Sequence, residues 1–128
     1  KTKIGKRTSI QAGAVIHVAQ GYDTSIGDDC VIGHLVHIEG CVVNNKCLIG
    51  VGAILLHDVQ VGDGSLVAAN ALVKEGAIIP PNQMALGVPA KVIDKQYSSE
   101  EISRIANLYV DNGKIYKEEL IKIDQSEC

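Results

Sequence analysis

The sequence predicts an all-β solenoid, a triangular parallel β-helix of hexapeptide repeats that is followed by a C-terminal α-helix. Three observations predict this fold class. Units of six residues open with Ile, Val or Leu along most of the chain. The position two residues before each of these is small almost throughout. Branched aliphatic residues, which favour strands, are abundant, whereas Phe and Trp are absent from the 128 residues.

The residues that open the units fall into three columns if three units make one turn. Every position of this grid is aliphatic, as expected for the core of rungs that stack about 4.8 Å apart. The columns are Ile4, Ile26, Val43, Val61 and Ile79; Ile10, Ile32, Ile49 and Val67; and Ile16, Ile38, Leu55 and Val73. One side of each short strand is therefore expected to face the interior of a prism.

A second inward position precedes the column residues and carries small side chains. Its occupants are Thr8, Ala14, Cys30, Cys41, Cys47, Ala53, Ser65, Ala71 and Ala77. We expect the three cysteines to be buried structural thiols, which a cytosolic protein keeps reduced. Glycines that directly follow column residues suit tight corners between short strands. These are Gly5, Gly27, Gly33, Gly50 and Gly62.

Two irregularities interrupt the six-residue period. The step from Ile16 to Ile26 is ten residues, so residues 17–25 contain a four-residue insertion that must form an outward loop. The step from Ile38 to Val43 is five residues. Both irregularities adjoin histidines, and they therefore bear on any site that the histidines form.

The repeat is expected to end at Pro80-Pro81, because proline supplies no donor to a β-ladder. Residues 87–93, GVPAKVI, then lead the chain off the solenoid. Lys1 already lies inside a repeat, which is consistent with further rungs upstream. We expect residues 1–95 to form the β-helix with its exit segment, and residues 96–128 to form the helix and tail.

The C-terminal helix is predicted from a capping box and a periodic apolar pattern. Ser98-Ser99-Glu100-Glu101 is typical of a helix start. Apolar residues then recur at helical spacing. They are Ile105, Tyr109, Tyr116, Leu120 and Ile123. We expect this helix to lie back against the solenoid and to be kinked at Asn112-Gly113.

Charge and hydropathy argue against several classes of function. The formal net charge is −3 and no basic cluster is present, which argues against nucleic acid and against an anionic membrane surface. No apolar run approaches the ~18 residues of a membrane span, and no signal peptide is visible. The sequence thus predicts a cytoplasmic protein that acts on neither nucleic acid nor a membrane.

The stretch GHLVHIEGC, residues 33–41, raises the question of a metal site. His17 and Glu39 each follow a residue of the third column, so both face outward and share one outer corner on adjacent rungs. His37 also faces outward, beside Glu39. His34 lies at a turn on a different edge, too far round the prism to join the others within one chain.

A second copy of the chain can bring His34 to that corner. Triangular solenoids assemble readily as cyclic trimers, whose heterologous interfaces join different surfaces of the subunit. One chain's His34 would then lie near the next chain's His17 and Glu39, in a site between subunits of a homotrimer. His57 follows its column residue by two positions, and we interpret it as a surface or interface residue away from this cluster.

The motifs SIQAGAVIH, IGHLVHIEGC, CLIGVGAILL, LVAANALV and GVPAKVI make residues 3–110 similar to the gamma-class carbonic anhydrase family. The resemblance implies a left-handed parallel β-helix and three histidine ligands for a metal. His17 and His34 match two of these histidines, whereas the third falls on Glu39. The family's glutamine that orients the metal-bound water corresponds to Gln11. The usual three-histidine set is therefore not intact.

The departure at Glu39 leaves three outcomes open. Glu39 itself ligates, which gives a two-histidine, one-carboxylate site suited to zinc, iron or cobalt. Alternatively His37, two residues earlier on the same face, provides the third imidazole. In the third outcome the metal is weakly held or lost.

The leading hypothesis that the resemblance implies is hydration of carbon dioxide to bicarbonate by metal-bound hydroxide, with zinc as cofactor and iron or cobalt as alternatives. Gln11 and Glu39 are the candidate catalytic residues, and Tyr22 or Asp23 are candidate proton relays. A carboxylate in place of an imidazole adds negative charge and makes the bound water less acidic. We therefore expect weak activity at neutral pH.

Two competing hypotheses come from other classes. Related hexapeptide proteins include acyltransferases and coenzyme A thioester hydrolases, which need a histidine base in a cleft between subunits, and His34 or His37 would serve. The chain lacks a long protruding loop to enclose an acceptor, which counts against the acyltransferase hypothesis. The other hypothesis is a catalytically silent trimeric scaffold.

Overall fold

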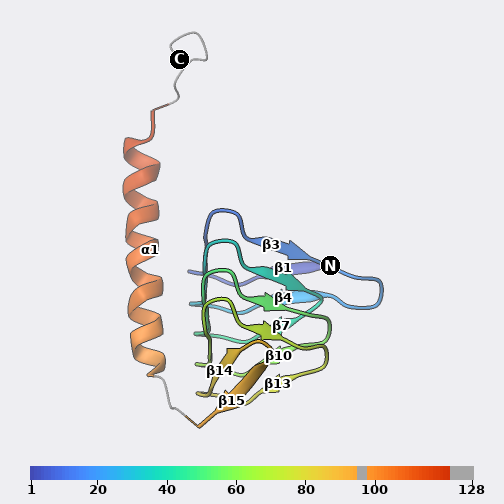
Figure 1. Ribbon diagram of the computed structural model, residues 1–128. Helices are drawn as coiled ribbons and strands as arrows, with labels where there is room; N and C mark the ends of the chain where they lie inside the picture. Colours follow the sequence, from blue (N-terminus) through green and yellow to red (C-terminus); the bar gives the residue numbers. More distant parts are fainter. Residues whose placement is uncertain (95–97, 122–128) are drawn as a thin grey trace.

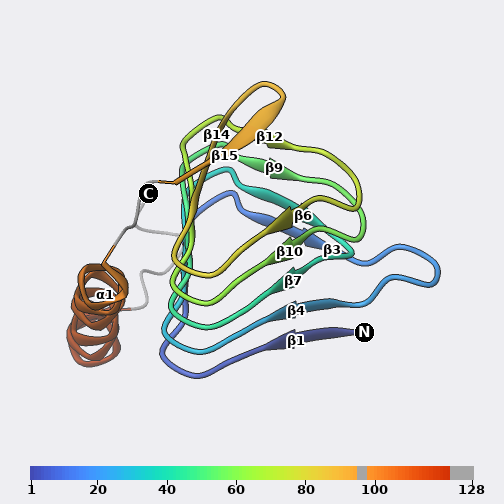
Figure 2. The same ribbon diagram turned by 90° about the horizontal axis from the view of Figure 1, so that it is seen from below.

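The protein is a parallel β-solenoid with one long helix beside it, which confirms the predicted fold class (Figure 1). The computed structural model describes residues 1–94 and 98–121. Successive turns contribute short strands to three sheets, here called sheets A, B and C. Seen along the stack, the strands enclose a triangular interior, and the helix lies outside one side of it (Figure 2).

Strands from successive turns lie side by side in each sheet. Sheet A consists of β1 (Thr2–Ile4), β4 (Thr24–Ile26), β7 (Val42–Val43), β10 (Gln60–Val61) and β13 (Ile78–Ile79). Sheet B consists of β2 (Ser9–Ile10), β5 (Val31–Ile32), β8 (Leu48–Ile49), β11 (Leu66–Val67), β14 (Met84–Gly87) and β15 (Ala90–Ile93). Sheet C consists of β3 (Val15–His17), β6 (His37–Glu39), β9 (Ile54–Leu55) and β12 (Leu72–Val73).

The three predicted columns line the interior. Strand register places each column residue beside its neighbour on the next turn, as for Ile16 with Ile38 and Ile38 with Leu55. Column residues from the second turn onward are buried, whereas Ile16, in the first rung of sheet C, is half-buried. The second inward position is buried at most turns and half-buried at Thr8, Ala14 and Ala77, and at Val36 and Val59 it holds a larger side chain than elsewhere.

The first rung differs from the others in exposure. Ile4 is 48% exposed, whereas Ile26, its neighbour in the same column, is 3% exposed. Ile10 is likewise 38% exposed, whereas Ile32 beside it is fully buried. The first rung therefore forms an open end of the stack.

Two backbone features allow the chain to turn at the corners. The residue three positions after most column residues has a positive φ, as at Asn70 (56°) and Asn82 (58°). Glycines directly after column residues serve another purpose, the close approach of adjacent rungs. A Cβ atom on Gly50 would lie 2.5 Å from the backbone nitrogen of Ala69 on the next turn. Only glycine fits such a corner without displacing the neighbouring backbone.

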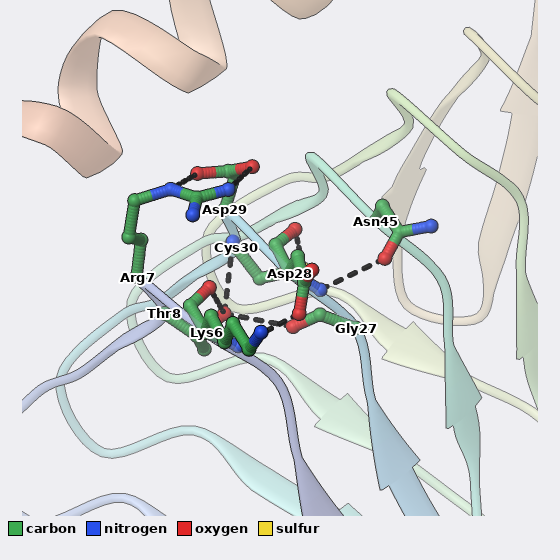
Figure 3. Close-up of polar contacts among 8 residues, drawn as sticks. All are labelled: Lys6, Arg7, Thr8, Gly27, Asp28, Asp29, Cys30 and Asn45. Carbon is green, nitrogen blue, oxygen red and sulfur yellow. Dashed lines mark hydrogen bonds and ion pairs between the residues drawn. The ribbon is translucent and has the colours of Figure 1, made fainter.

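Side-chain oxygens connect successive rungs at the corner between sheets A and B (Figure 3). The Lys6 N–H donates to Asp28 Oδ1 at 2.7 Å, and the Asp28 N–H donates to Asn45 Oδ1 at 2.8 Å. The Asn45 N–H in turn donates to Asp63 Oδ1 at 2.9 Å. This polar ladder satisfies corner N–H groups that the sheets leave without a partner.

An ion pair on the same corner joins the first two rungs (Figure 3). Arg7 Nε and Nη2 donate to the two carboxylate oxygens of Asp29, both at 2.7 Å. The hydrogen bond from Arg7 holds the pKa of Asp29 below its ordinary value, against the opposing effect of desolvation. Thr8 Oγ1 donates to the Gly27 carbonyl at 2.7 Å and accepts from the Cys30 N–H at 3.1 Å, so this polar inward residue is paired.

Both predicted irregularities are confirmed as departures from the regular rung. The loop after β3 projects from the solenoid (Figure 2), and in it Ala19 and Tyr22 exchange backbone hydrogen bonds at 3.0 and 3.3 Å. Thr24 Oγ1 closes the base of the loop by donating to the His17 carbonyl at 2.5 Å and accepting from the Gly40 N–H at 3.0 Å. Gly40, with a φ of 59°, makes the turn of the five-residue step.

The prediction that the repeat ends at Pro80-Pro81 is wrong by one strand. β14 pairs with β11, and Ala85 is buried beside Val67 in the second column. The prolines lie at the corner before β14, outside the strands, so they remove no ladder donor. β15 then folds back antiparallel to β14 after a cis Val88–Pro89 bond, instead of leading the chain directly away.

Helix α1 (Ser99–Glu119) begins at the predicted capping box. Ser98 is the N-cap, and its side chain accepts a hydrogen bond from the Glu101 N–H at 3.4 Å. The helix continues through Asn112-Gly113 without interruption, so the predicted kink is wrong. A Cβ atom on Gly113 would meet nothing within 4 Å, so no neighbour forces the helix to bend there.

α1 packs on the outer face of sheet B, over β2 and β5, and reaches beyond the first rung (Figure 1). Its buried residues are Ile102 and Ala106, whereas Tyr109, Tyr116 and Leu120 of the predicted apolar series are exposed. The predicted helical residue Ile123 and the boundary between residues 95 and 96 lie outside the described residues. Among those described, no helix is both long and apolar enough to span a membrane.

Candidate metal centre

Sheet C carries the predicted polar residues on its outer face. β3 and β6 pair so that His17 lies beside Glu39, on adjacent rungs of one corner. Strand alternation explains this placement, because Ile16 and Ile38 point inward and their neighbours must point outward. His17 is exposed, and the Glu39 side chain is 23% exposed. The predicted adjacency of these two donors is thus observed within a single chain.

Two imidazoles face the carboxylate of Glu39. His37 Nε2 lies 3.4 Å from Glu39 Oε2, and His57 Nε2 lies 3.0 Å from Glu39 Oε1. The first contact follows from the outward positions of His37 and Glu39 on β6. The second corrects the interpretation of His57 as a residue away from the cluster, since it makes the shorter of the two contacts.

The position of His57 depends on the shape of the corner. The register of β6 and β9, continued past the strand ends, places Gly40 beside His57, and the Asp58 N–H donates to the Gly40 carbonyl at 3.0 Å. A Cβ atom on Gly40 would lie 2.5 Å from the Cβ atom of Tyr22, which comes from the projecting loop. The Tyr22 ring centroid is 5.6 Å from that of His57. The five-residue step from Ile38 to Val43 shortens this corner, and it is the feature of the sequence that could have predicted the arrangement.

His34 lies on the other side of sheet C, at the corner between β5 and β6, and is exposed. Gln11 occupies the same corner one rung earlier, where the Leu35 N–H donates to the carbonyl of Ala12 at 3.2 Å. The strands of sheet C separate this corner from that of His17. The structure therefore divides the candidate residues into two groups, with His34 and Gln11 in one of them.

The donors of the two corners suit a divalent metal when taken together. The described residues contain no group of three or more His, Cys, Asp or Glu that can hold a metal within one chain. Two imidazoles and a carboxylate are nevertheless suitable ligands for zinc, iron and cobalt. His17 and Glu39 present two such donors side by side. A three-ligand site thus needs one donor from a second copy.

Comparisons with known proteins agree with the observed repeat. The family described as bacterial transferase hexapeptide (six repeats) matches residues 40–75. The chain is 37% identical over 118 residues to a carbonic anhydrase of Geobacillus kaustophilus, covering 91% of this chain and 65% of that protein. It is 36% identical over 124 residues to gamma carbonic anhydrase 2, mitochondrial, of Arabidopsis thaliana, covering 91% and 45%. The chain belongs to the gamma-class carbonic anhydrase-like family of hexapeptide-repeat proteins.

The gamma-class carbonic anhydrase-like fold also occurs in proteins described by other chemistry. A solved structure from Bacillus cereus, described as an acetyltransferase, superimposes with a TM-score of 0.85 at 30% identity, covering 93% of this chain and 79% of that one. The present chain spans 65% of the length of the Geobacillus relative and 45% of the Arabidopsis relative. Family membership explains the solenoid, but it does not decide between these two activities.

Proposed function

We propose that the protein is a gamma-class carbonic anhydrase-like metalloprotein that hydrates carbon dioxide to bicarbonate between the subunits of a homotrimer. The observation that carries the proposal is the pair of outward donors, His17 and Glu39, on adjacent rungs of one corner. The identity to proteins named carbonic anhydrase supports it. His17, Glu39 and the partner subunit's His34 form the proposed donor set.

Exposed apolar side chains near both corners support an interface between copies. Val15 and Ile54, on the outer face of sheet C, are 50% and 38% exposed. Leu35 and Val51, near the corner of His34, are 67% and 46% exposed. Gathered exposed apolar side chains are typical of interaction surfaces. A contact between the face of sheet C on one chain and the His34 corner of the next is heterologous, and a threefold rotation would close it as a ring.

A bound divalent metal supplies a hydroxide nucleophile near neutral pH by lowering the pKa of water. We propose zinc, and iron or cobalt suit the same donors. Glu39 places a negative charge where the family resemblance implies a neutral imidazole, which opposes loss of a proton at the site. Gln11 shares its corner with His34 and would hydrogen-bond the reacting water from that side. Weak hydration at pH 7 is the expected result.

Acyl transfer from coenzyme A is the second candidate function. The similarity to the Bacillus cereus structure described as an acetyltransferase, with a TM-score of 0.85, favours it. His34 is exposed at a proposed subunit contact, where a histidine base would work. His37 is a second candidate base. Saturable binding of acetyl-coenzyme A by the metal-free protein would support this activity and would count against the hydratase.

The test of the proposed function is metal content followed by a hydration assay. The protein is purified without chelator or a nickel column, and zinc, iron and cobalt are measured per chain by elemental analysis. We expect close to one metal per chain in a trimer, and slow carbon dioxide hydration that is lost in His17→Ala. A trimer without metal, or a metal-loaded trimer without hydration, would overturn the proposal.

A further inference from the structure

The two rungs that carry the proposed donors both end at the corner between sheets C and A. β3 ends at His17 and β6 ends at Glu39, and these two residues are the last pair in the register of the two strands. The projecting loop follows His17, and the turn at Gly40 follows Glu39. Regular strand pairing therefore stops at the donors, and other bonds must fix their backbone on the far side.

Thr24 supplies these bonds from the start of β4. Its Oγ1 donates to the His17 carbonyl at 2.5 Å and accepts from the Gly40 N–H at 3.0 Å. The same N–H also donates to the His17 carbonyl, at 3.2 Å. The His17 carbonyl belongs to the peptide group that follows His17, and the Gly40 N–H belongs to the one that follows Glu39. One hydroxyl thus bridges the peptide groups next to both donors.

Burial makes this bridge strong. Thr24 is fully buried, and a hydrogen bond that is shielded from water is electrostatically stronger than an exposed one. A buried N–H or carbonyl without a partner is correspondingly costly. Without the hydroxyl, the Gly40 N–H and the His17 carbonyl would keep only their mutual contact, and we expect the two peptide groups to move. Metal sites tolerate deviations of only about 0.2 Å in ligand distances, so such a movement would weaken binding.

Ser65 forms the same kind of bridge at another corner. It is also fully buried, and its Oγ donates to the Pro80 carbonyl at 2.7 Å and accepts from the Gln83 N–H at 3.2 Å. Pro80 and Gln83 lie between β13 and β14, at the corner between sheets A and B. No proposed metal donor lies there. Thr24 and Ser65 are therefore alike in burial and bonding, but only Thr24 touches the backbone of the donors.

We propose that Thr24 is a positioning residue whose buried hydroxyl sets the spacing of His17 and Glu39 as metal donors. This inference rests on the proposed metal site of His17, Glu39 and the partner subunit's His34. The repeat requires only a small inward side chain at this position, as at the buried Cys41 on the next turn. Neither the repeat nor the family resemblance assigns Thr24 a role at a metal.

The test is the zinc affinity of the assembled protein, measured by competition with a chelator. Thr24→Val keeps the shape but removes the hydroxyl, and we expect it to bind zinc ~10- to 100-fold more weakly, the usual effect of losing a residue that supports a ligand. Thr24→Ala is a second variant without the hydroxyl and should show the same loss. Thr24→Ser keeps the hydroxyl, and its affinity should stay within about threefold of the wild type.

Ser65→Ala is the matched control, because it removes an equally buried bridge away from the donors. Its zinc affinity should also stay within about threefold of the wild type. Thermal unfolding of the metal-free proteins should show a similar decrease in Tm for Thr24→Val and Ser65→Ala. Hydrogen exchange of the Gly40 amide should accelerate in Thr24→Val alone. The visible absorption of the cobalt-substituted protein should likewise change in Thr24→Val and not in Ser65→Ala.

The outcomes distinguish this inference from the proposed function. Zinc affinity that is unchanged in both Thr24→Val and Thr24→Ala, or that falls equally in Ser65→Ala, overturns the role of Thr24 and leaves the hydratase proposal intact. Zinc affinity that falls in these variants and recovers in Thr24→Ser supports the inference, even where the wild type hydrates no carbon dioxide and the hydratase proposal fails. A wild-type protein that binds no zinc overturns both.

Discussion

The inner and outer faces of sheet C lie on the same strands but follow different rules. Ile38 and Leu55 point inward and are fully buried, whereas Glu39 and His57, one and two residues further along, point outward and are partly exposed. On the inner face any aliphatic side chain of suitable volume preserves the stack. On the outer face the chemical identity of each residue decides what can bind.

This difference separates stability from function within a few ångströms. The solenoid tolerates a glutamate at position 39, where the family resemblance implies a histidine, because this outward side chain contributes little to the core. The same change alters the charge of the proposed metal site. Substitutions on the two faces should therefore affect different measurements.

The largest effect is expected inside the stack. Ile49→Ala removes a fully buried side chain of the second column, and we expect it to lower the free energy of unfolding by about 2–5 kcal/mol. Chemical denaturation monitored by circular dichroism measures this change. Glu39→Gln is the outer counterpart and should change stability by less than about 0.5 kcal/mol. Equal losses in the two variants would contradict the separation of the faces.

Adding one methyl group at a corner should have the next largest effect. In Gly50→Ala the new Cβ atom would lie 2.5 Å from the backbone nitrogen of Ala69, so we expect a loss of about 1–3 kcal/mol as the rungs move apart. Gly113→Ala is the control, because its Cβ atom would meet nothing within 4 Å. That helical substitution should stabilise the protein by up to about 1 kcal/mol. A tolerated Gly50→Ala would show that the rungs can separate at low cost.

Glu39→His tests the outer face alone. We expect kcat/KM for carbon dioxide hydration at pH 7 to rise about tenfold, a difference of about 1.4 kcal/mol in the barrier, because a neutral imidazole makes proton loss at the site easier. Stopped-flow hydration assays on fully metal-loaded trimers measure this change. No gain in rate would mean that the charge of Glu39 does not limit the reaction.

The smallest effect is expected at the ion pair between Arg7 and Asp29. Asp29→Asn should cost about 0.2–1 kcal/mol at pH 7, where Asp29 is ionised. Because folding lowers the pKa of Asp29, its contribution is present above the ordinary value and is lost as the pH falls through the lowered one. Urea unfolding at pH 7 and pH 3 should show the difference between wild type and variant shrinking in acid. Asp111→Asn, at the exposed pair with Lys114, is the comparison variant and should change the stability at pH 7 by less than Asp29→Asn does.

The parts of the fold that repeat were predictable from the sequence. The columns, the outward loop and the adjacency of His17 and Glu39 all follow from a six-residue period and strand alternation. Cooperation with a second copy remains a prediction, since His34 and His17 lie on different corners of one chain. The cap at Ser98 was also recognisable, because it depends on four consecutive residues.

The errors arose where three-dimensional shape overrides the pattern. The sequence predicts that the repeat ends at Pro80-Pro81, but a corner needs no ladder donor, so β14 adds another strand. The residue count along the repeat predicts that His57 lies away from the cluster. The distance of 3.0 Å between His57 Nε2 and Glu39 Oε1 shows that His57 reaches the cluster. A helix face also depends on its partner, which explains why Ile102 and Ala106 are buried instead of the predicted series.

The spacing of the first column has a consequence for how such a protein can lengthen during evolution. The steps from Ile4 to Ile26, Val43, Val61 and Ile79 are 22, 17, 18 and 18 residues. The two irregular turns are the ones that bring His17, Glu39 and His57 onto one corner. Duplication of an 18-residue turn beyond β9 would extend the prism and leave that corner unchanged. The same duplication between β6 and β9 would move His57 one rung further from Glu39 and separate the pair.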